Sequence, residues 1–571
     1  MQNRNLVAGL SVLYCALFIV YSTFYVRTDG PLLGVGDVGY HEFVGYLFAK
    51  QVTWWPAPHL KWFTDLVVYP YGVNAGFQSW SLEREYLNVL CHKLLGESNW
   101  LQWYLVASAL VTGVGTVLLL RTRYSNLRSW LLAYLTTFLS FGVTHRYPAH
   151  LNLGAAHWLV LNIIADFLTC QKVFERQRLS LQWLLLRAAL LLACLGGDLS
   201  YLAGYALISF TLSSGYVVYA LYRQANWHLR DWWTDAAQRP FQTAILLIGI
   251  ALLSWLYLPI CFQLFFLTRG FKAFMGSYWA NPLRLVFPWA LLQVWNPNWF
   301  GDNIESTRFF GLGWSVFLPG VAGLVYVIRK RLWYCLPLVT LMVLCIAFHP
   351  TKFPLLKIFP WASMIRVTGR VGVFLAAGFG LLALSLPRPK RSFIVLWALL
   401  AAAEFTFSMR LPTQGQIIPL SSEMKTHLDT IASTPGEALF DWPFCVRGGY
   451  GLRELCPDGG DLGADFALTR LHHKKVIGLS SGRLTKEMLP SLYADEWDAL
   501  MAVRDRCFNE KEWAKFEKFF ERYDFAGLHL HVRFVPPKCL DEYTKRFGQP
   551  ISRADLPGSG ETWFIPKAKR L

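Results

Sequence analysis

Apolar segments of about the length of a lipid bilayer dominate the first 410 residues of this chain. A membrane-spanning helix needs about 20 mostly apolar residues. Such segments begin near residues 6, 101, 129, 153, 181, 200, 242, 311, 333, 370 and 392, and those near 129, 153 and 181 are the shortest. This succession predicts a polytopic α-helical membrane protein with about 11 transmembrane helices.

The composition supports this prediction. Hydrophobic residues make up 54% of the 571 residues and charged residues only 16%, whereas soluble domains average about 25% charged residues. A soluble globule, a disordered chain, a collagen-like chain and a coiled coil are therefore excluded.

The net charge of +17 reports membrane topology rather than a nucleic-acid surface. Residues 411–571 contain 22 basic and 22 acidic residues, so the excess of 32 basic over 15 acidic residues lies in the apolar part. A nucleic-acid binder would gather its basic residues on one polar face. Here they are scattered between apolar segments, which is typical of a membrane protein.

Alternate connectors between the apolar segments carry the basic residues. By the positive-inside bias, these connectors and the N-terminus with Arg4 face the cytoplasm. Eleven spans then place residues 411–571 outside. The basic residues are Arg121, Arg123 and Arg128; Lys172, Arg176 and Arg178; Arg223, Arg230 and Arg239; Arg329, Lys330 and Arg331; and Arg388, Lys390 and Arg391.

Two regions are expected. Residues 1–410 form a transmembrane module, with the first span retained as an anchor and with long, aromatic-rich outer loops at 26–99 and 263–310. Residues 411–571 have mixed charge and strand-like pieces, which predict a periplasmic, or extracytoplasmic, α+β domain.

Four of the eleven cysteines fall in this tail: Cys445, Cys456, Cys507 and Cys539. In an oxidising compartment they would form two disulfides, and the sequence leaves all three pairings open.

Acidic residues are scarce in the first region, and ten of its fifteen lie in predicted outer segments. The most informative of these is Asp37, which follows a glycine-rich turn and precedes an amphipathic segment. It can cap that helix through a backbone N–H, or act as a general base at the membrane surface. His41 and Glu42 lie one helical turn on and are candidates for the same face. Two acids inside spans, Asp166 and Glu404, are functional candidates by position, but both lie near span ends.

Other polar residues are expected at the same outer boundary. Two arginines beside several acids at one depth favour a site for an anionic phosphate group, although a single interfacial arginine often only reaches lipid headgroups. The residues are His145, Arg146, His150 and Asn152 in "THRYPAHLNL", Asp198 in "GGDLSYLAGY", Asn296, Asn298, Asp302 and Glu305 in "WNPNWFGDNIESTRFFGLG", and Arg366 and Arg370 in "MIRVTGR".

Several short motifs occur in a characteristic order: "GD" after the first span, "YPYGVN", "HLNL", "NPNWF", "FFGLG", "RVTGR" and, in the tail, "HHKKVIGLSSGR". In this order they resemble the GT-C-type, YfhO-like multispanning glycosyltransferases of bacteria. The resemblance implies a GT-C fold and transfer of a sugar from a polyprenyl-phosphate carrier. It implies that Asp37 is the catalytic base, that Asp198 matches a second acidic position, and that Arg366 and Arg370 hold the lipid phosphate.

From this resemblance we expect an integral membrane glycosyltransferase of the bacterial cytoplasmic (inner) membrane, acting at its outer face on a glycolipid, polysaccharide or protein acceptor. Its partners would be the lipid-linked donor, membrane lipid and that acceptor, with no nucleic acid. The first loop lacks the paired acids of some GT-C enzymes, so no cofactor is identified and a divalent cation stays an open alternative.

Two other functions are compatible with the sequence. A lipid-linked sugar flippase or other transporter would carry ionisable residues along a path through the bundle. A non-catalytic assembly protein for envelope polysaccharide would use the 411–571 domain as its working part, with "HHKKVIGLSSGR" as either an acceptor-binding edge or a structural element.

Overall fold

The computed structural model describes residues 2–26, 32–34, 37–74, 76, 78, 80–96, 100–146, 150–224, 230–267, 279–287, 310–359, 361, 365, 367–387, 391–410, 417–448, 452, 454–456, 466–481 and 484–568. The chain forms two compact units. The first comprises Met1–Arg27, Trp80–Arg84 and Trp100–Thr413, and the second comprises Thr28–Ser79, Glu85–Asn99 and Gln414–Leu571.

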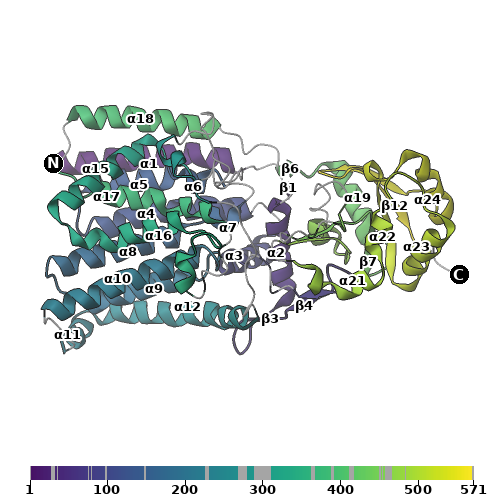
Figure 1. Cartoon of the computed structure of the whole chain (residues 1–571), viewed down its shortest axis with the longest axis horizontal. Helices are drawn as coiled ribbons and strands as arrows, with labels where there is room; N and C mark the ends of the chain where they lie inside the picture. Colours follow the sequence, from purple (N-terminus) through teal and green to yellow (C-terminus); the bar gives the residue numbers. More distant parts are fainter. Residues whose placement is uncertain are drawn as a thin grey trace. The chain divides into compact units, whose positions relative to one another are not determined.

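The first unit is a bundle of helices that run side by side along one direction (Figure 1). A helix begins near every predicted position: α1 (Gln2–Tyr25), α4 (Trp100–Leu120), α5 (Asn126–Phe138), α8 (His157–Phe174), α9 (Leu181–Cys194), α10 (Leu202–Gln224), α12 (Pro240–Leu267), α15 (Trp314–Lys330), α16 (Leu336–Ala347), α17 (Gly372–Ala383) and α18 (Arg391–Arg410). Short helices α6 (Phe141–Thr144), α7 (Leu151–Gly154), α11 (Arg230–Gln238) and α13 (Leu283–Val286) lie in the connectors, with 3₁₀ turns at Trp333–Cys335, Leu355–Ile358 and Thr368–Val371.

Four apolar helices among the described residues are long enough to cross a membrane: Trp100–Leu120, Leu151–Phe174, Leu202–Arg223 and Pro240–Leu267. The outer surface of α12 exposes large apolar side chains, among them Phe241, Ile248 and Phe266. Water-exposed apolar surface on this scale is rare in soluble proteins. The first unit is therefore membrane-embedded, while a total of eleven crossings stays a prediction.

The two acids inside predicted spans, Asp166 and Glu404, form hydrogen bonds that connect neighbouring helices. Asp166 on α8 accepts hydrogen bonds from Arg187 Nε at 2.6 Å and from Ser209 at 2.7 Å. Glu404 on α18 accepts the backbone N–H groups of Trp314 at 2.6 Å and Ser315 at 3.1 Å, where α15 begins. A carboxylate at a helix N-terminus satisfies unpaired N–H groups and complements the helix dipole. Both acids have local structural partners.

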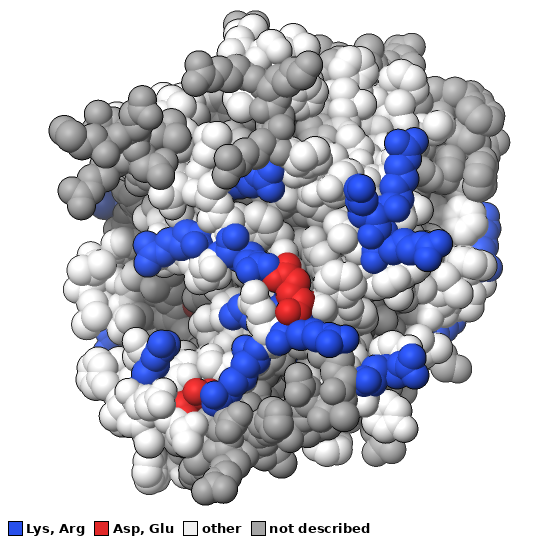
Figure 2. All heavy atoms as spheres, turned by 90° about the vertical axis from the view of Figure 1, so that its left-hand side faces the viewer, with Lys and Arg blue, Asp and Glu red and all other residues white. Residues whose placement is uncertain are grey.

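One end of the bundle is basic. Figure 2 shows lysines and arginines spread over this face with few acids among them. Where the structure describes the burial of the predicted cytoplasmic residues, these are exposed: Arg121, Arg123, Arg176, Arg178, Arg223, Arg239, Arg329, Lys330 and Arg331. Because consecutive helices run in opposite directions, the described connector residues 139–146, 150–156, 195–201, 348–359 and 367–371 lie at the other end.

The second unit contains a four-stranded sheet in the order β11 (Ser552–Leu556), β12 (Gly560–Pro566), β10 (Phe525–His531), β7 (Ala438–Trp442). The β7–β10 pair is parallel and the others are antiparallel. Its helices are α2 (Asp37–Gln51), α19 (Ser422–Ser433), α20 (Thr469–His472), α21 (Pro490–Ala494), α22 (Trp497–Met501), α23 (Glu510–Arg522), α24 (Leu540–Phe547) and, from Glu85 on, α3 (Leu82–Leu95). Its 3₁₀ turns are Lys486–Met488, Val532–Phe534 and Pro537–Cys539. Two-stranded sheets pair β1 (Leu32–Gly34) with β6 (Ile417–Pro419), β2 (Val52–Thr53) with β3 (His59–Leu60), β4 (Phe63–Thr64) with β5 (Val73–Asn74), and β8 (Val446–Gly448) with β9 (Leu479–Ser481). The C-terminal region thus has the mixed α and β content that the sequence predicts.

The first outer loop packs with the tail inside this second unit. Tyr69 N–H donates to the Val476 carbonyl and Val476 N–H donates to the Leu66 carbonyl, each at 3.0 Å. Lys475 Nζ lies 2.6 Å from Asp65 and 2.8 Å from Glu437. The segments that carry "YPYGVN" and "HHKKVIGL" therefore contact each other. The first outer loop was expected to belong with residues 1–410, but most of it lies in the same compact unit as the tail.

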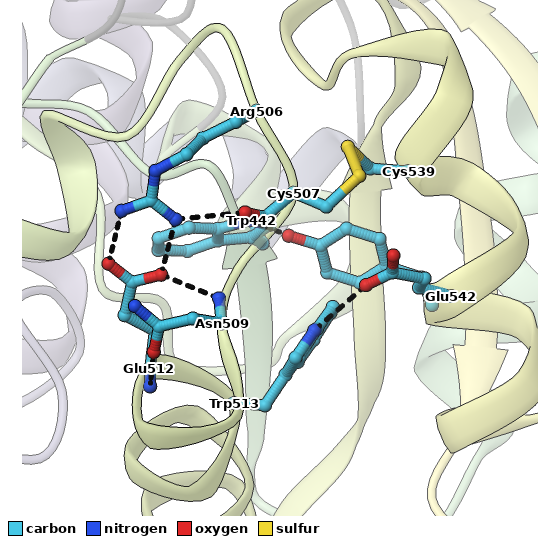
Figure 3. Close-up of a disulfide and its surroundings, with 9 residues drawn as sticks. Trp442, Arg506, Cys507, Asn509, Glu512, Trp513, Cys539 and Glu542 are labelled. Carbon is cyan, nitrogen blue, oxygen red and sulfur yellow. Dashed lines mark hydrogen bonds and ion pairs between the residues drawn. A yellow bond between two sulfur atoms is a disulfide. The ribbon is translucent and has the colours of Figure 1, made fainter.

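Two disulfides join Cys445 to Cys456 and Cys507 to Cys539, which selects one of the three pairings that the sequence left open. Figure 3 shows the second disulfide beside Trp442, whose indole N–H donates to the Tyr543 hydroxyl at 2.7 Å. On the left of the same view, Arg506 forms two hydrogen bonds with Glu512, at 2.7 and 2.8 Å. The disulfide thus ties the chain just before α23 to the start of α24.

Replacing Cys507 and Cys539 together by serine is expected to lower the stability of the second unit by about 4 kcal/mol, because the crosslink closes a loop of 32 residues and restricts the unfolded chain. The measurement is denaturant unfolding of the full chain, followed by tryptophan fluorescence. The pair Cys170 and Cys335, buried without a disulfide, provides a serine-substituted control that keeps this loop closed. An unchanged unfolding midpoint in C507S/C539S would contradict the assigned pairing.

Candidate functional site

Asp198 organises the polar residues at the end of the bundle opposite the basic face. Its side chain is buried and accepts a hydrogen bond from Asn152 Nδ2 at 2.6 Å. The other carboxylate oxygen accepts the backbone N–H groups of Ser200 at 3.0 Å and Tyr201 at 2.9 Å. Asp198 therefore fixes the turn that leads into α10 and holds it against the short helix α7, which carries Asn152.

Tyr201 connects Asp198 to Arg370. The Tyr201 hydroxyl accepts the Val367 N–H at 3.0 Å, and the Arg370 guanidinium carbon lies 4.6 Å from the Tyr201 ring centroid. A cation over an aromatic face is attracted by the ring electrons. Three of the predicted site residues, Asn152, Asp198 and Arg370, are thus brought together through a tyrosine that the sequence analysis did not select.

The neighbouring turn supplies a second arginine. Arg146 is fully buried and its Nε donates to the Gly142 carbonyl at 2.7 Å. Gly142 in turn lies against Gly372, so closely that a Cβ at residue 142 would lie 2.2 Å from the Gly372 carbonyl oxygen. This close approach of α6 to the start of α17 explains how the turn carrying Arg146 reaches the segment that carries Arg370.

The two histidines of this turn differ in setting. His145 is buried and its ring stacks on Phe141, with 5.0 Å between ring centroids. His150 is half-buried, and its carbonyl accepts the N–H groups of Leu153 and Gly154 at the start of α7. The turn therefore presents one stacked and one half-buried imidazole.

Glu83 forms a polar cluster next to Asp198. Residues 81–83 run alongside residues 196–198: Ser81 forms a bridge with Asp198, and Glu83 N–H donates to the Gly196 carbonyl at 2.8 Å. The Glu83 carboxylate accepts hydrogen bonds from Tyr104 at 3.1 Å and Trp158 at 3.0 Å. Two acids from distant parts of the sequence therefore lie side by side.

His157 completes this cluster. Its Nε2 lies 3.2 Å from a Glu83 carboxylate oxygen, and its Nδ1 lies 2.8 Å from Ser108 Oγ. Burial acts to raise the pKa of Glu83, but the charge and hydrogen bond of His157, together with the bonds from Trp158 and Tyr104, hold that pKa below its usual value. Glu83 is thus stabilised as a carboxylate. The sequence analysis counted it among ten outer acids but gave it no role, since no local motif marks it.

In the second unit, Asp37 is the first residue of α2. Further along α2, the His41 side chain is buried and Glu42 forms an ion pair with Arg470 at 2.7 Å. That ion pair and the edge-to-face contact of Phe43 with Phe466, 4.9 Å between centroids, hold α2 against the segment around α20. Glu42 therefore has a packing partner in the tail. Asp37 lies at the N-terminus of α2, where the backbone N–H groups have no partner within the helix.

Five of the residues considered from sequence lie outside the described residues: Asn296, Asn298, Asp302, Glu305 and Arg366. Nearby, the Ala280 N–H donates to Thr368 Oγ1 at 3.0 Å, which attaches the described end of the 263–310 loop to the segment before Arg370.

Among the described residues, one group of His, Cys, Asp and Glu side chains has the spacing of a metal site: Asp441, His529 and His531. All three lie in the four-stranded sheet of the second unit.

No protein-family model and no curated protein matches the sequence. The structure matches the arabinofuranosyltransferase AftD from Mycobacteria with a TM-score of 0.52 and 13% sequence identity, over 100% of this chain and 40% of AftD. The chain has a GT-C-type fold. It spans well under half of the length of that transferase.

Two further solved structures are similar. ArnT from Cupriavidus metallidurans matches with a TM-score of 0.49 and 12% identity over 98% of each chain. The Archaeoglobus fulgidus oligosaccharyltransferase matches with a TM-score of 0.46 and 11% identity, over 98% of this chain and 75% of that one. A fold supports many reactions, so the activity must be argued from the side chains.

Proposed function

We propose that this protein is an integral membrane glycosyltransferase that moves a sugar from a polyprenyl-phosphate carrier to a glycolipid, polysaccharide or protein acceptor of the cell envelope. The reaction takes place at the outer face of the bacterial cytoplasmic membrane, with the N-terminus in the cytoplasm and the C-terminal region outside. A polyprenyl carrier keeps its chain in lipid and its phosphosugar at the headgroup plane, so the site must lie at that boundary.

The observation that carries this proposal is the arrangement around Tyr201. Arg370 lies over the Tyr201 ring, Asp198 holds the Tyr201 backbone, and Asn152 holds Asp198. This cluster lies at the end of the bundle opposite the basic face, which the positive-inside bias assigns to the cytoplasm. An arginine held in a defined orientation there is suited to bind the phosphate of a lipid-linked sugar.

Asp37 is the proposed general base. Its carboxylate takes the proton of the acceptor hydroxyl as that oxygen attacks the anomeric carbon of the sugar. The bond from the anomeric carbon to the carrier phosphate breaks at the same time, and the product has inverted configuration.

Arg370, with Arg366, stabilises the charge that develops on the departing phosphate. A carrier phosphate is a good leaving group, so the bond to it breaks without a protein acid. Arg146, His145, His150, His41 and Glu305 complete the substrate-binding set that we propose. Glu42 also belongs to it, through its ion pair that holds α2 in place.

Two donor side chains near Asp37 have structural roles among the described residues. In α2, His41 is buried and Glu42 is paired with Arg470. The proposed mechanism is written without a metal ion, and a divalent cation stays an open alternative.

A flippase is the second candidate function. It requires ionisable residues along a path through the bundle. In the described spans the acids Asp166 and Glu404 are instead satisfied by an arginine, by hydroxyl groups and by backbone N–H groups. This distribution favours the enzyme.

The test is a screen of the purified full chain, in detergent or in liposomes, against polyprenyl-phosphate sugars that differ in the sugar. We expect release of the carrier phosphate from at least one donor when an acceptor mixture is present. Lipid translocation measured in the same liposomes, with no release across the whole panel, would replace this proposal with the flippase.

A further inference from the structure

A layer of buried histidines lies on one face of the four-stranded sheet in the second unit. In the register of the sheet, Asp441 on β7 pairs with His529 on β10, and His531 follows two residues later on the same strand. Side chains two residues apart along a strand, or directly paired across neighbouring strands, point to the same face of the sheet. Asp441, His529 and His531 therefore project together, and they are 4%, 1% and 1% exposed.

The helix α19 covers this face and adds His427. His427 Nε2 lies 3.2 Å from His529 Nε2, and His427 Nδ1 lies 2.9 Å from Ser552 Oγ on β11. Leu428 on α19 packs with Ala554 and Leu556 of the same strand. The apolar contact between α19 and β11 thus covers the histidines and Asp441.

Asp441 lacks the partner that a buried carboxylate needs. Its contacts are His529 Nδ1 at 2.9 Å and His531 Nε2 at 3.9 Å, and no lysine or arginine of the described residues forms an ion pair with it. A buried carboxylate is costly unless it is paired with a cation or coordinates a metal.

The spacing of the three groups fits a metal ion. One ligand atom from each residue lies within 4.8 Å of the others, and the two distances to the Asp441 oxygen are 2.9 and 3.9 Å. Ligands about 2.0–2.1 Å from a tetrahedral Zn²⁺ are separated by about 3.3 Å. A set of two histidines and one carboxylate is a common set of zinc ligands.

The hydrogen bonds around these ligands also fit a metal site. If His529 binds the metal through Nδ1, its Nε2–H donates to His427 Nε2, and His427 Nδ1–H donates to Ser552 Oγ. Histidine ligands of metals are normally oriented in this way by a hydrogen bond from the second ring nitrogen.

We propose that Asp441, His529 and His531 bind a divalent transition metal ion, expected to be Zn²⁺, which crosslinks β7 to β10. The ligands are buried, so the ion stabilises the fold and does not meet substrate. This site is independent of the proposed sugar transfer, and it lies on a different set of residues from those assigned to that reaction.

The test uses the full chain, purified without chelator and without an affinity tag that binds metal. Inductively coupled plasma mass spectrometry is expected to find about one zinc ion per chain, as a three-ligand site predicts. D441N and H531Q are expected to reduce this content at least tenfold. The matched control is H473N, because His473 is an exposed histidine of the same unit with a φ of 57° that asparagine tolerates.

A second measurement does not depend on how well the variants fold. Wild-type chain stripped with chelator and reloaded with Co²⁺ is expected to show the visible absorption bands of tetrahedral cobalt coordinated by nitrogen and oxygen, and Zn²⁺ is expected to displace them. Wild-type protein that carries less than about a tenth of an ion per chain, and that gives no such bands, would overturn the proposal. The cluster would then be a chain of hydrogen bonds from Ser552 through His427 and His529 to Asp441.

Discussion

Replacing Asp37 by asparagine is expected to slow sugar transfer by about 10²- to 10⁴-fold, because the amide cannot accept the proton of the attacking hydroxyl. The variant keeps the size of the side chain and its place at the start of α2, so expression and binding of the donor are expected to stay close to those of the wild type. The measurement is the initial rate of carrier release with a donor that the wild-type enzyme uses.

The matched control for this variant is D65N. Asp65 lies in the same outer loop, and its half-exposed side chain pairs with Lys475, an exposed ion pair that contributes at most about 1 kcal/mol. We expect D65N to retain near wild-type turnover. Equal rates in D37N and the wild type would remove Asp37 from the mechanism.

Replacing Arg370 by glutamine is expected to lower kcat by about 10²- to 10³-fold, the usual loss when one group that stabilises developing negative charge is removed. R370K is expected to recover part of this activity, since lysine restores the charge but not the planar, two-pronged contact with phosphate. The measurement compares kcat and KM of both variants with those of the wild type for one polyprenyl-phosphate sugar.

R329Q serves as the control for Arg370, because Arg329 is an exposed residue in the last turn of α15 and belongs to the basic residues predicted to face the cytoplasm. The contact of Arg370 with Tyr201 is worth only about 0.5–1 kcal/mol, so R370Q is expected to fold. If R370Q and R329Q both kept full kcat, the phosphate-binding role of Arg370 would be wrong.

The helical architecture was predictable because membrane-spanning helices have a simple requirement. Each must present an apolar surface to lipid, so length and hydropathy alone locate α4, α10 and α12. The short helix α5 (Asn126–Phe138) is different, because it begins where a span was predicted but has only 13 residues. Hydropathy marks where such a segment begins and does not fix how far its helix extends.

The candidate site was only partly predictable. Asn152, Asp198 and Arg370 lie in motifs, so sequence reasoning found them. Glu83 and Tyr201 depend on long-range contacts, a backbone bridge between residues 81 and 198 and a ring beneath Arg370. No spacing along the chain encodes those contacts.

The tail shows the same limit. Its mixed charge predicted an α+β region, but which cysteines pair depends on how β7, α23 and α24 pack. The histidines of the proposed metal site also come from separate segments, and only the register of β7 with β10 aligns Asp441 with His529. The "HHKKVIGL" motif was open to two interpretations from sequence, an acceptor-binding edge or a structural element. It holds the first outer loop against the tail through Lys475 and Val476, which fits the structural interpretation.

The most direct measurement of the central claim is carrier release by wild-type and D37N protein, assayed side by side with one polyprenyl-phosphate sugar and one acceptor. The proposed mechanism predicts that the wild-type protein produces free carrier phosphate and glycosylated acceptor in equal amounts, and that D37N produces both at least about 10²-fold more slowly. Equal release by the two proteins, or translocation of the lipid-linked sugar by the wild type without any cleavage, would contradict it.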